Sequence, residues 1–197
     1  DPVLEVVPVL PAPVSRSVER GLARAGLLSQ APPVFHAAGR VPLAGLFLAL
    51  AGLEATGLLG CATRVSGGLP AGFYGLEAML VEGVLRCLAG EPRAEGATRI
   101  DPYALGRVLG LDRAPEVKTI RRRISLLAGH GKAEDLLASM AAHHLAHHHD
   151  DSKAGAVLYV DGHVRAYQGT RRIAKTHAAR LRFPAPATVE TWISDGH

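Results

Sequence analysis

Residues 103–127 have the sequence YALGRVLGLDRAPEVKTIRRRISLL, and this stretch decides how the surrounding chain is interpreted. Its first part has the apolar spacing of a short helix and ends at Gly110-Leu111. Asp112-Arg113-Ala114 predicts a turn. Pro115 suits the first position of a second helix, because the N–H that proline lacks has no partner there. The stretch therefore predicts two short helices joined by a turn, which is the arrangement of a helix-turn-helix unit.

The second of these helices is predicted to bury one apolar stripe and to expose its cations. The stripe consists of Val117, Ile120, Ile124 and Leu127. The candidate DNA-binding residues are Arg113 in the turn and Lys118, Arg121 and Arg122 on the opposite face. A rigid helix with cations on one face can enter a major groove or contact phosphates, so we predict double-stranded DNA as a partner. An ordinary helix hairpin with a solvated basic face has the same spacing.

The net charge of +4 is unevenly distributed along the chain. Residues 99–123 carry seven Lys or Arg against three Asp or Glu, and residues 162–189 carry six against none. Concentrated positive charge favours a polyanion such as nucleic acid, although a solvated basic face is an equally good explanation of charge alone. The second basic segment supplies four further candidate DNA contacts, namely Arg165, Arg171, Arg172 and Lys175.

The chain before this unit is predicted to be helical after an extended start. Residues 1–40 predict an arm rich in Pro and Val and a short helix at 15–28, and residues 41–149 predict a helical region. A long apolar helix is expected at 43–60. Its unbroken apolar part, 43–53, is too short to cross a bilayer, so we predict a buried core helix and no membrane partner.

The cleanest periodic pattern lies at 73–89. Six residues are predicted to form one buried face, namely Phe73, Leu76, Leu80, Val84, Cys87 and Leu88. Three charged residues mark the solvent side, namely Glu77, Glu82 and Arg86. The two cysteines, Cys61 and Cys87, both lie in apolar stretches and predict buried free thiols, which fits a reducing cytoplasm.

The pattern changes from helical to extended after residue 150. A helix is predicted at 133–148 and a buried strand at 156–160. Asp161-Gly162 predicts a hairpin turn, 163–167 the returning strand and 183–193 a third strand. The fold class expected from the whole chain is therefore α+β and mainly α.

Two groups of residues have the side chains that bind metals. Asp161 ends the predicted strand, and metal-dependent transfer of nucleotidyl groups needs carboxylates held rigidly at strand ends. An aspartate before glycine is more often simply a turn former than a catalytic residue. The second group is a cluster at 143–149 with histidines one helical turn apart. Two ligands do not close a tetrahedral site, so we interpret this cluster as a polar helix end.

Five segments together resemble a family of bacterial transposases of the DDE type. These segments are 69–76, 104–122, 158–165, Lys175-Thr176-His177 and 186–192. The resemblance covers residues 41–195. It implies a helical N-terminal region followed by an RNase H-like catalytic domain that begins within 153–197. It also implies that Asp161 is the first catalytic and metal-binding carboxylate, and that Mg²⁺ or Mn²⁺ is the cofactor of the complete domain. A protein of this family would be associated with the bacterial nucleoid.

The second and third acidic positions of that family lie downstream of the matched segments. We therefore expect this chain to be a truncated transposase, one that binds DNA but lacks a complete metal site, and the sequence leaves open whether it is an enzyme. Two other classes of protein remain as alternatives. One is a non-catalytic helix-turn-helix regulator, and the other is a helical interaction protein that forms a homo-oligomer through its apolar helices.

Overall fold

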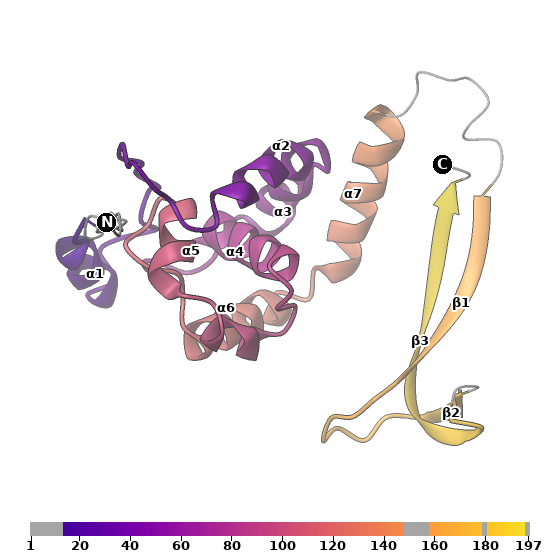
Figure 1. Cartoon of the computed structure of the whole chain (residues 1–197). Coiled ribbons are helices and arrows are strands. Elements are labelled where there is room, and N and C mark those ends of the chain that lie inside the picture. The colour runs from indigo at the N-terminus through magenta and orange to yellow at the C-terminus, as the bar shows by residue number, and fades with distance from the viewer. Residues whose placement is uncertain (1–13, 148–157, 179–180, 196–197) are drawn as a thin grey trace, which may run out of the picture. The chain divides into compact units, whose positions relative to one another are not determined.

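The computed structural model describes residues 14–147, 158–178 and 181–195 of the chain. The chain divides into two compact units, residues 1–144 and residues 145–197, which we call the helical unit and the strand unit. The predicted fold class is confirmed, because helices dominate and the only described sheet is a small antiparallel one near the C-terminal end (Figure 1). The predicted arm at 1–14 lies outside the described residues except for its last one, Val14.

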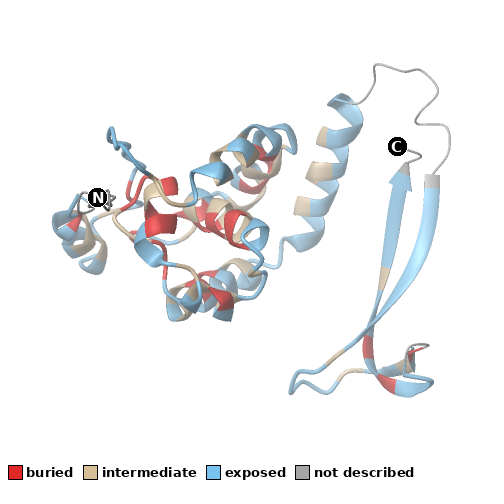
Figure 2. Ribbon diagram, viewed as in Figure 1, coloured by how far each residue is buried: buried red, intermediate tan, exposed pale blue. Residues whose placement is uncertain are grey.

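The helices are short and follow one another closely. Among the described residues, seven are α-helices: α1 (Ser17–Arg24), α2 (Leu48–Ala55), α3 (Leu58–Ser66), α4 (Leu76–Leu88), α5 (Pro102–Val108), α6 (Val117–Gly129) and α7 (Ala133–His147). Two are 3-10 helices: η1 (Ala44–Phe47) and η2 (Ala94–Thr98). The buried side chains gather on α4, α5 and α6 (Figure 2), where Leu85, Leu105 and Ile120 belong to one apolar core.

The single core helix predicted at 43–60 is wrong. The chain forms η1, α2 and α3 instead, with left-handed backbone at Leu43 (φ 63°) and Gly57 (φ 69°). The Thr56 hydroxyl donates to the Leu53 carbonyl over 2.6 Å and accepts from the Leu58 N–H, which fixes the break before α3. Leu53 is the only buried side chain of 43–60, so this stretch is largely a surface element.

No single described helix combines the length and apolar character needed to cross a membrane. The bent pair formed by 44–55 and 58–66 meets that test only as a pair, with an angle of 59° between its parts.

The buried face of α4 also differs from the prediction. Glu82 and Arg86, predicted to face solvent, are buried together with Leu76, Met79 and Leu85. The reason is local pairing. Arg86 Nε donates to Glu82 Oε1 over 2.8 Å, and its Nη1 donates to the carbonyls of Glu91 and Arg93 over 2.7 and 2.6 Å. Burial raises the pKa of Glu82 and outweighs the opposing charge and hydrogen bond of Arg86.

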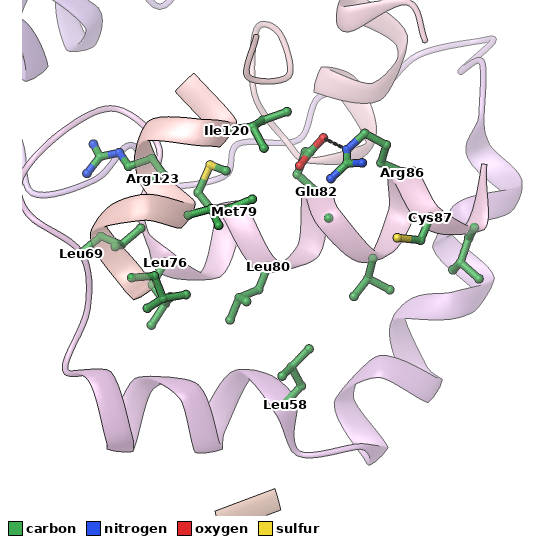
Figure 3. A pocket seen from close by; sticks show the side chains of 15 residues that line it. Leu58, Leu69, Leu76, Met79, Leu80, Glu82, Arg86, Cys87, Ile120 and Arg123 are labelled. Atoms are coloured by element: carbon green, nitrogen blue, oxygen red, sulfur yellow. Dashed lines mark hydrogen bonds and ion pairs between the residues drawn. The ribbon is translucent and has the colours of Figure 1, made fainter. Parts of the chain in front are cut away.

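The stripe predicted to be buried is buried only at Phe73 and Leu76, and its later residues line an open apolar groove (Figure 3). Leu80 and Val84 line this groove together with Leu58 of α3. Cys87 and Leu88 also line it and are exposed. The prediction of two buried thiols therefore holds for Cys61 and is wrong for Cys87.

The connection between α5 and α6 is longer than the predicted turn. The Asp101 carboxylate caps α5 by accepting from the Tyr103 N–H over 2.9 Å, with Pro102 at the first helical position. The connection folds back on α5, because the Ala114 N–H donates to the Pro102 carbonyl over 2.8 Å. Pro115 is buried within it, and α6 begins two residues later at Val117.

The sheet consists of β1 (Leu158–Ala166), β2 (Lys175–Ala178) and β3 (Phe183–Asp195) in the order β1-β3-β2, with antiparallel pairing throughout. The hairpin turn predicted at Asp161-Gly162 is wrong, because β1 passes through it without a break. β3 offers a partner along the whole of β1, with Asp161 opposite Trp192 and Gly162 opposite Thr191. A continuous ladder satisfies more backbone groups than a turn at this place would.

Side chains alternate between the two faces of the β1–β3 ribbon. One face carries aliphatic residues, including Val160, Val164, Val189 and Ile193, and all four are exposed. The buried side chains that the structure describes in the strand unit are three alanines, Ala178, Ala185 and Ala187. The ribbon therefore has a full hydrogen-bond ladder but almost no core.

Candidate functional site

The outer face of α6 carries the cations that the sequence singled out. Lys118, Arg121 and Arg122 are all exposed, as predicted, because Ile120 points to the opposite side and is fully buried in the core. Within the described parts of the chain, Lys118 and Arg122 make no hydrogen bond or ion pair. Arg121 pairs with Glu95 of η2. The face therefore presents two unpaired cations and one that is held by a surface carboxylate.

Residues of the connection before α6 are fixed by a partner that the sequence did not suggest. Arg20 of α1 donates from Nε and Nη2 to the two carboxylate oxygens of Asp112 over 2.7 and 2.6 Å. Its guanidinium also lies 3.9 Å from the centroid of the Phe73 ring. Arg113, a predicted DNA contact, lies next to this pair and is half-buried, with its Nη1 3.7 Å from Glu116 Oε1. Two-pronged arginine–carboxylate pairs define geometry well, so α1 is anchored to the connection.

The two partners of this ion pair shift each other's pKa. Burial acts to raise the pKa of Asp112, but the hydrogen bonds and charge of Arg20 outweigh it and hold the pKa below the usual 3.8. Burial acts to lower the pKa of Arg20, and its bonds to Asp112 and to the Tyr74 hydroxyl outweigh that effect and raise it. The pair is therefore fully charged at neutral pH.

A cleft of about 500 Å³ lies between α1, the 70–74 loop and α6. Four arginines line it, namely Arg20, Arg24, Arg122 and Arg123, and no carboxylate does. Arg123, which follows the exposed cations on α6, is itself buried. Its Nη1 donates to the Pro70 carbonyl over 2.6 Å, and its Nη2 lies 3.5 Å from the Ala71 carbonyl. Sequence reasoning identified only Arg122 of this set.

The strand unit carries the second group of predicted cations. Arg165, Arg171, Arg172 and Lys175 are all exposed. The Arg165 guanidinium lies 3.5 Å from Glu190 on the neighbouring strand, and the Arg171 N–H donates to the Tyr167 hydroxyl over 3.2 Å. The cations of this unit are therefore available to a polyanion in solvent.

Asp161 lies in the middle of β1 and not at a strand end, and its side chain is exposed. By alternation it shares one face of the ribbon with His163, Glu190 and Trp192. The part of the chain that the structure describes contains no group of three or more His, Cys, Asp or Glu side chains placed to bind one metal ion. Among these described residues, Asp161 is therefore not joined by the further carboxylates that a metal pair requires.

The histidine cluster is partly described. His143 of α7 has its Nε2 3.2 Å from the Ala55 carbonyl, and its ring occupies the space where a side chain at Gly57 would be. His144 and His147 also have interactions, while His148 and His149 lie outside the described residues. His143 thus packs against the break between α2 and α3, which is a structural role.

Comparisons with known proteins give one result. No curated protein and no solved structure matches the chain. The family model described as Transposase protein matches residues 12–197, which include both the helical unit from α1 onward and the strand unit. The chain therefore belongs to this family of transposases.

Proposed function

We propose that this chain is the DNA-binding part, with the first strands of the catalytic domain, of a bacterial transposase of the DDE type. The helical unit binds duplex DNA through a helix-turn-helix formed by α5 and α6. The observation that carries the proposal is the outer face of α6, where Lys118 and Arg122 are exposed and unpaired on a helix whose inner face is fixed in the core by Ile120.

Duplex DNA is the partner that suits this face best. An exposed, unpaired arginine or lysine keeps its hydration and gives nothing to folding, whereas each phosphate that it neutralises releases a condensed counterion. The helix is also anchored, since the Arg20–Asp112 pair and the bond from Ala114 to Pro102 hold the connection that precedes it. A rigid cationic helix loses little conformational entropy when it enters a groove.

The strand unit supports the second half of the proposal less directly. Asp161 lies on the first strand of an antiparallel pair, as the first carboxylate of an RNase H-like domain does, and exposed cations are present in the same unit. Mg²⁺ or Mn²⁺ would need further carboxylates beside Asp161, and the described residues place none there in a group of three. No metal-dependent step follows from these residues, so we propose that this chain binds DNA without cutting it.

The proposal is tested by measuring binding of the full chain to a labelled random-sequence duplex by fluorescence anisotropy across a salt series. The test variant is Lys118→Ala/Arg122→Ala. If both cations contact phosphates, the variant binds more weakly and the slope of log K against log salt falls by about two. The matched control is Arg40→Ala/Arg93→Ala, which removes the same charge from exposed positions outside α6 and leaves the slope within about one of the parent.

Two outcomes would contradict the proposal. Binding by the parent that does not depend on salt would exclude phosphate contacts as its source. Equal losses in the test and control variants would show that net charge, and not the face of α6, determines affinity.

A further inference from the structure

Arg123 differs from the other buried arginines that the structure describes. Arg16 pairs with Glu19 over 2.6 Å, and Arg86 pairs with Glu82 over 2.8 Å. Arg123 is equally buried, but its bonds go to the carbonyls of Pro70 and Ala71, and no carboxylate among the described residues contacts it. Its Nε has no hydrogen-bond partner within the described parts of the chain. A full positive charge is therefore held inside the protein without a counterion.

A buried charge without a counterion lowers the stability of the folded protein. A buried charge is normally paired, because its desolvation is compensated only by an opposite charge close by. The cost is visible in the pKa of Arg123, which burial lowers and the neighbouring charge of Arg122 lowers further. The loop is also shaped to accept this side chain, since a Cβ at Gly72 would lie 1.8 Å from its Nη2. The desolvation cost of an arginine in this position is compensated if an anion from solvent binds next to it.

The α1–α6 cleft, defined above by Arg20, Arg24, Arg122 and Arg123, is where such an anion would enter. Arg24 of α1 and Arg122 of α6 are exposed on its two sides, and neither has a partner among the residues described. Arg20 is held in place by Asp112. Thr119 adds a hydroxyl to the lining. The cleft thus combines fixed and unpaired guanidinium groups with no acidic side chain among its lining residues.

We propose that the α1–α6 cleft binds a phosphate group, with Arg24 and Arg122 contacting it and Arg123 supplying positive charge from the wall. The planar guanidinium group of arginine can donate two hydrogen bonds to two oxygens of one phosphate. The cleft offers two unpaired guanidinium groups for this, and no carboxylate lines it. The phosphate is a backbone phosphate of duplex DNA. This assignment of the source rests on the proposed function, whereas the affinity for phosphate does not.

The proposal extends the DNA-contacting surface beyond the helix-turn-helix. In a duplex that contacts Lys118 and Arg122 on α6, one backbone phosphate would be bound between α6 and α1. Because Arg24 lies outside the segment 103–127, its contribution separates the cleft from the helix-turn-helix.

The first experiment measures duplex binding by the full chain and by Arg24→Ala, with Arg40→Ala as the matched control. We expect Arg24→Ala to bind roughly tenfold more weakly, because a hydrogen bond to a charged group is lost, and to lower the salt slope by about one. Arg24→Lys keeps the charge and recovers the slope but only part of the affinity, since it lacks the guanidinium group. Far-ultraviolet circular dichroism verifies that each variant is folded.

The second experiment replaces DNA by inorganic phosphate. At constant ionic strength, exchanging chloride for phosphate at about ten times its dissociation constant should raise the melting temperature of the parent by roughly 3 °C more than that of Arg24→Ala. The general stabilising effect of phosphate acts on both proteins equally and cancels in this difference. An equal shift in both proteins would overturn the phosphate site.

The two experiments separate the two proposals. If Lys118→Ala/Arg122→Ala loses DNA affinity while Arg24→Ala binds like the parent, the cleft proposal fails and the proposed function stands. If the parent does not bind DNA but phosphate stabilises it more than Arg24→Ala, the proposed function fails, the phosphate site is supported and its assignment to the DNA backbone is overturned.

Discussion

Helix α4 of the helical unit hides charged side chains from solvent, whereas the β1–β3 ribbon of the strand unit exposes large apolar ones. Glu82 and Arg86 are 1% and 4% exposed, while Val189 and Ile193 are 63% and 65% exposed. Residue polarity alone would place all four the other way round. The difference lies in what surrounds them, because α4 packs within a helical core, whereas within the strand unit no described element covers the aliphatic face of the ribbon.

This contrast shows which interactions stabilise each unit. In the helical unit, charges are tolerated inside because each finds an opposite charge or several carbonyls, and apolar burial supplies the free energy. In the strand unit, the ladder of nine β1–β3 pairs is complete, but hydrogen bonds that replace bonds to water give only a modest net gain. We therefore expect the helical unit to be much more stable than the strand unit.

The largest loss of stability is expected from removing one partner of the buried Glu82–Arg86 ion pair in α4. Glu82→Ala leaves the Arg86 guanidinium buried without its carboxylate, so the free energy of unfolding should fall by about 3–5 kcal/mol. Urea unfolding followed by circular dichroism at 222 nm measures this. Glu77→Ala, on the exposed side of the same helix, should change it by less than about 0.5 kcal/mol. A loss at Glu82 as small as that at Glu77 would mean that the pair is not buried in solution.

A smaller loss of stability, which depends on pH, is expected from breaking the Arg20–Asp112 ion pair that anchors α1. Asp112→Asn removes one charge of a pair that is only one-sixth exposed, and the free energy of unfolding should fall by about 1–2 kcal/mol at pH 7. Because the pKa of Asp112 lies below its usual 3.8 in the folded protein, its contribution is present above about pH 4 and is lost as the pH falls through the folded value.

Urea unfolding of the parent and of Asp112→Asn from pH 7 to pH 3 measures this dependence. The difference in stability between the two proteins should narrow only below about pH 4. The control Glu54→Gln, at an exposed position of α2, should show a small and nearly constant difference. If the Asp112→Asn difference narrows near pH 6 instead, the carboxylate is not the group that titrates.

Much of the helical fold could be predicted from the sequence, since apolar spacing indicates helices directly. What spacing did not indicate was which face is buried. In α4 the apolar stripe and the Glu82–Arg86 pair compete for the core, and the pair is buried because Arg86 also satisfies the carbonyls of Glu91 and Arg93. Those carbonyls lie beyond the helix, so no periodic pattern within 73–89 contains the information.

The strand unit shows the opposite error. Asp161-Gly162 is a strong turn signal taken alone, but β3 lies some thirty residues later and pairs along the whole of β1. Local turn propensity is weaker than a continuous ladder, and the partner strand cannot be recognised from the residues around 161. A sheet of so few strands is marginal by itself, and the three alanines that are its buried described side chains give it little core.

The exposure of Lys118, Arg121 and Arg122 could be predicted from the sequence, but the α1–α6 cleft could not. It depends on α1 and the 70–74 loop meeting α6, which is a long-range arrangement. One local signal was available. Arg121, Arg122 and Arg123 are consecutive, and at 100° per residue three neighbours cannot all face solvent beside a buried Ile120. Arg123 follows Ile120 by three positions and so shares its face.

The smallest effect is expected in the strand unit, where the contrast between the two regions can be tested with the same substitution. Val189→Ala shortens a side chain that is mostly exposed, so the free energy of unfolding measured at 222 nm should change by less than about 0.5 kcal/mol. Val108→Ala makes the same change on α5, where the side chain is only 2% exposed, and should lower it by about 2 kcal/mol, because two buried methyl groups are lost.

Trp192, the single tryptophan, lies on β3 and reports on the strand unit alone. Its fluorescence in the parent should change at a lower urea concentration than the ellipticity at 222 nm, because a ribbon without a core opens before the helices unfold. Val189→Ala should shift only the fluorescence transition and Val108→Ala mainly the ellipticity transition. If the fluorescence and ellipticity transitions coincide in all three proteins, the ribbon is stabilised by burial that the described residues do not contain. The two units would then differ in surface exposure but not in stability.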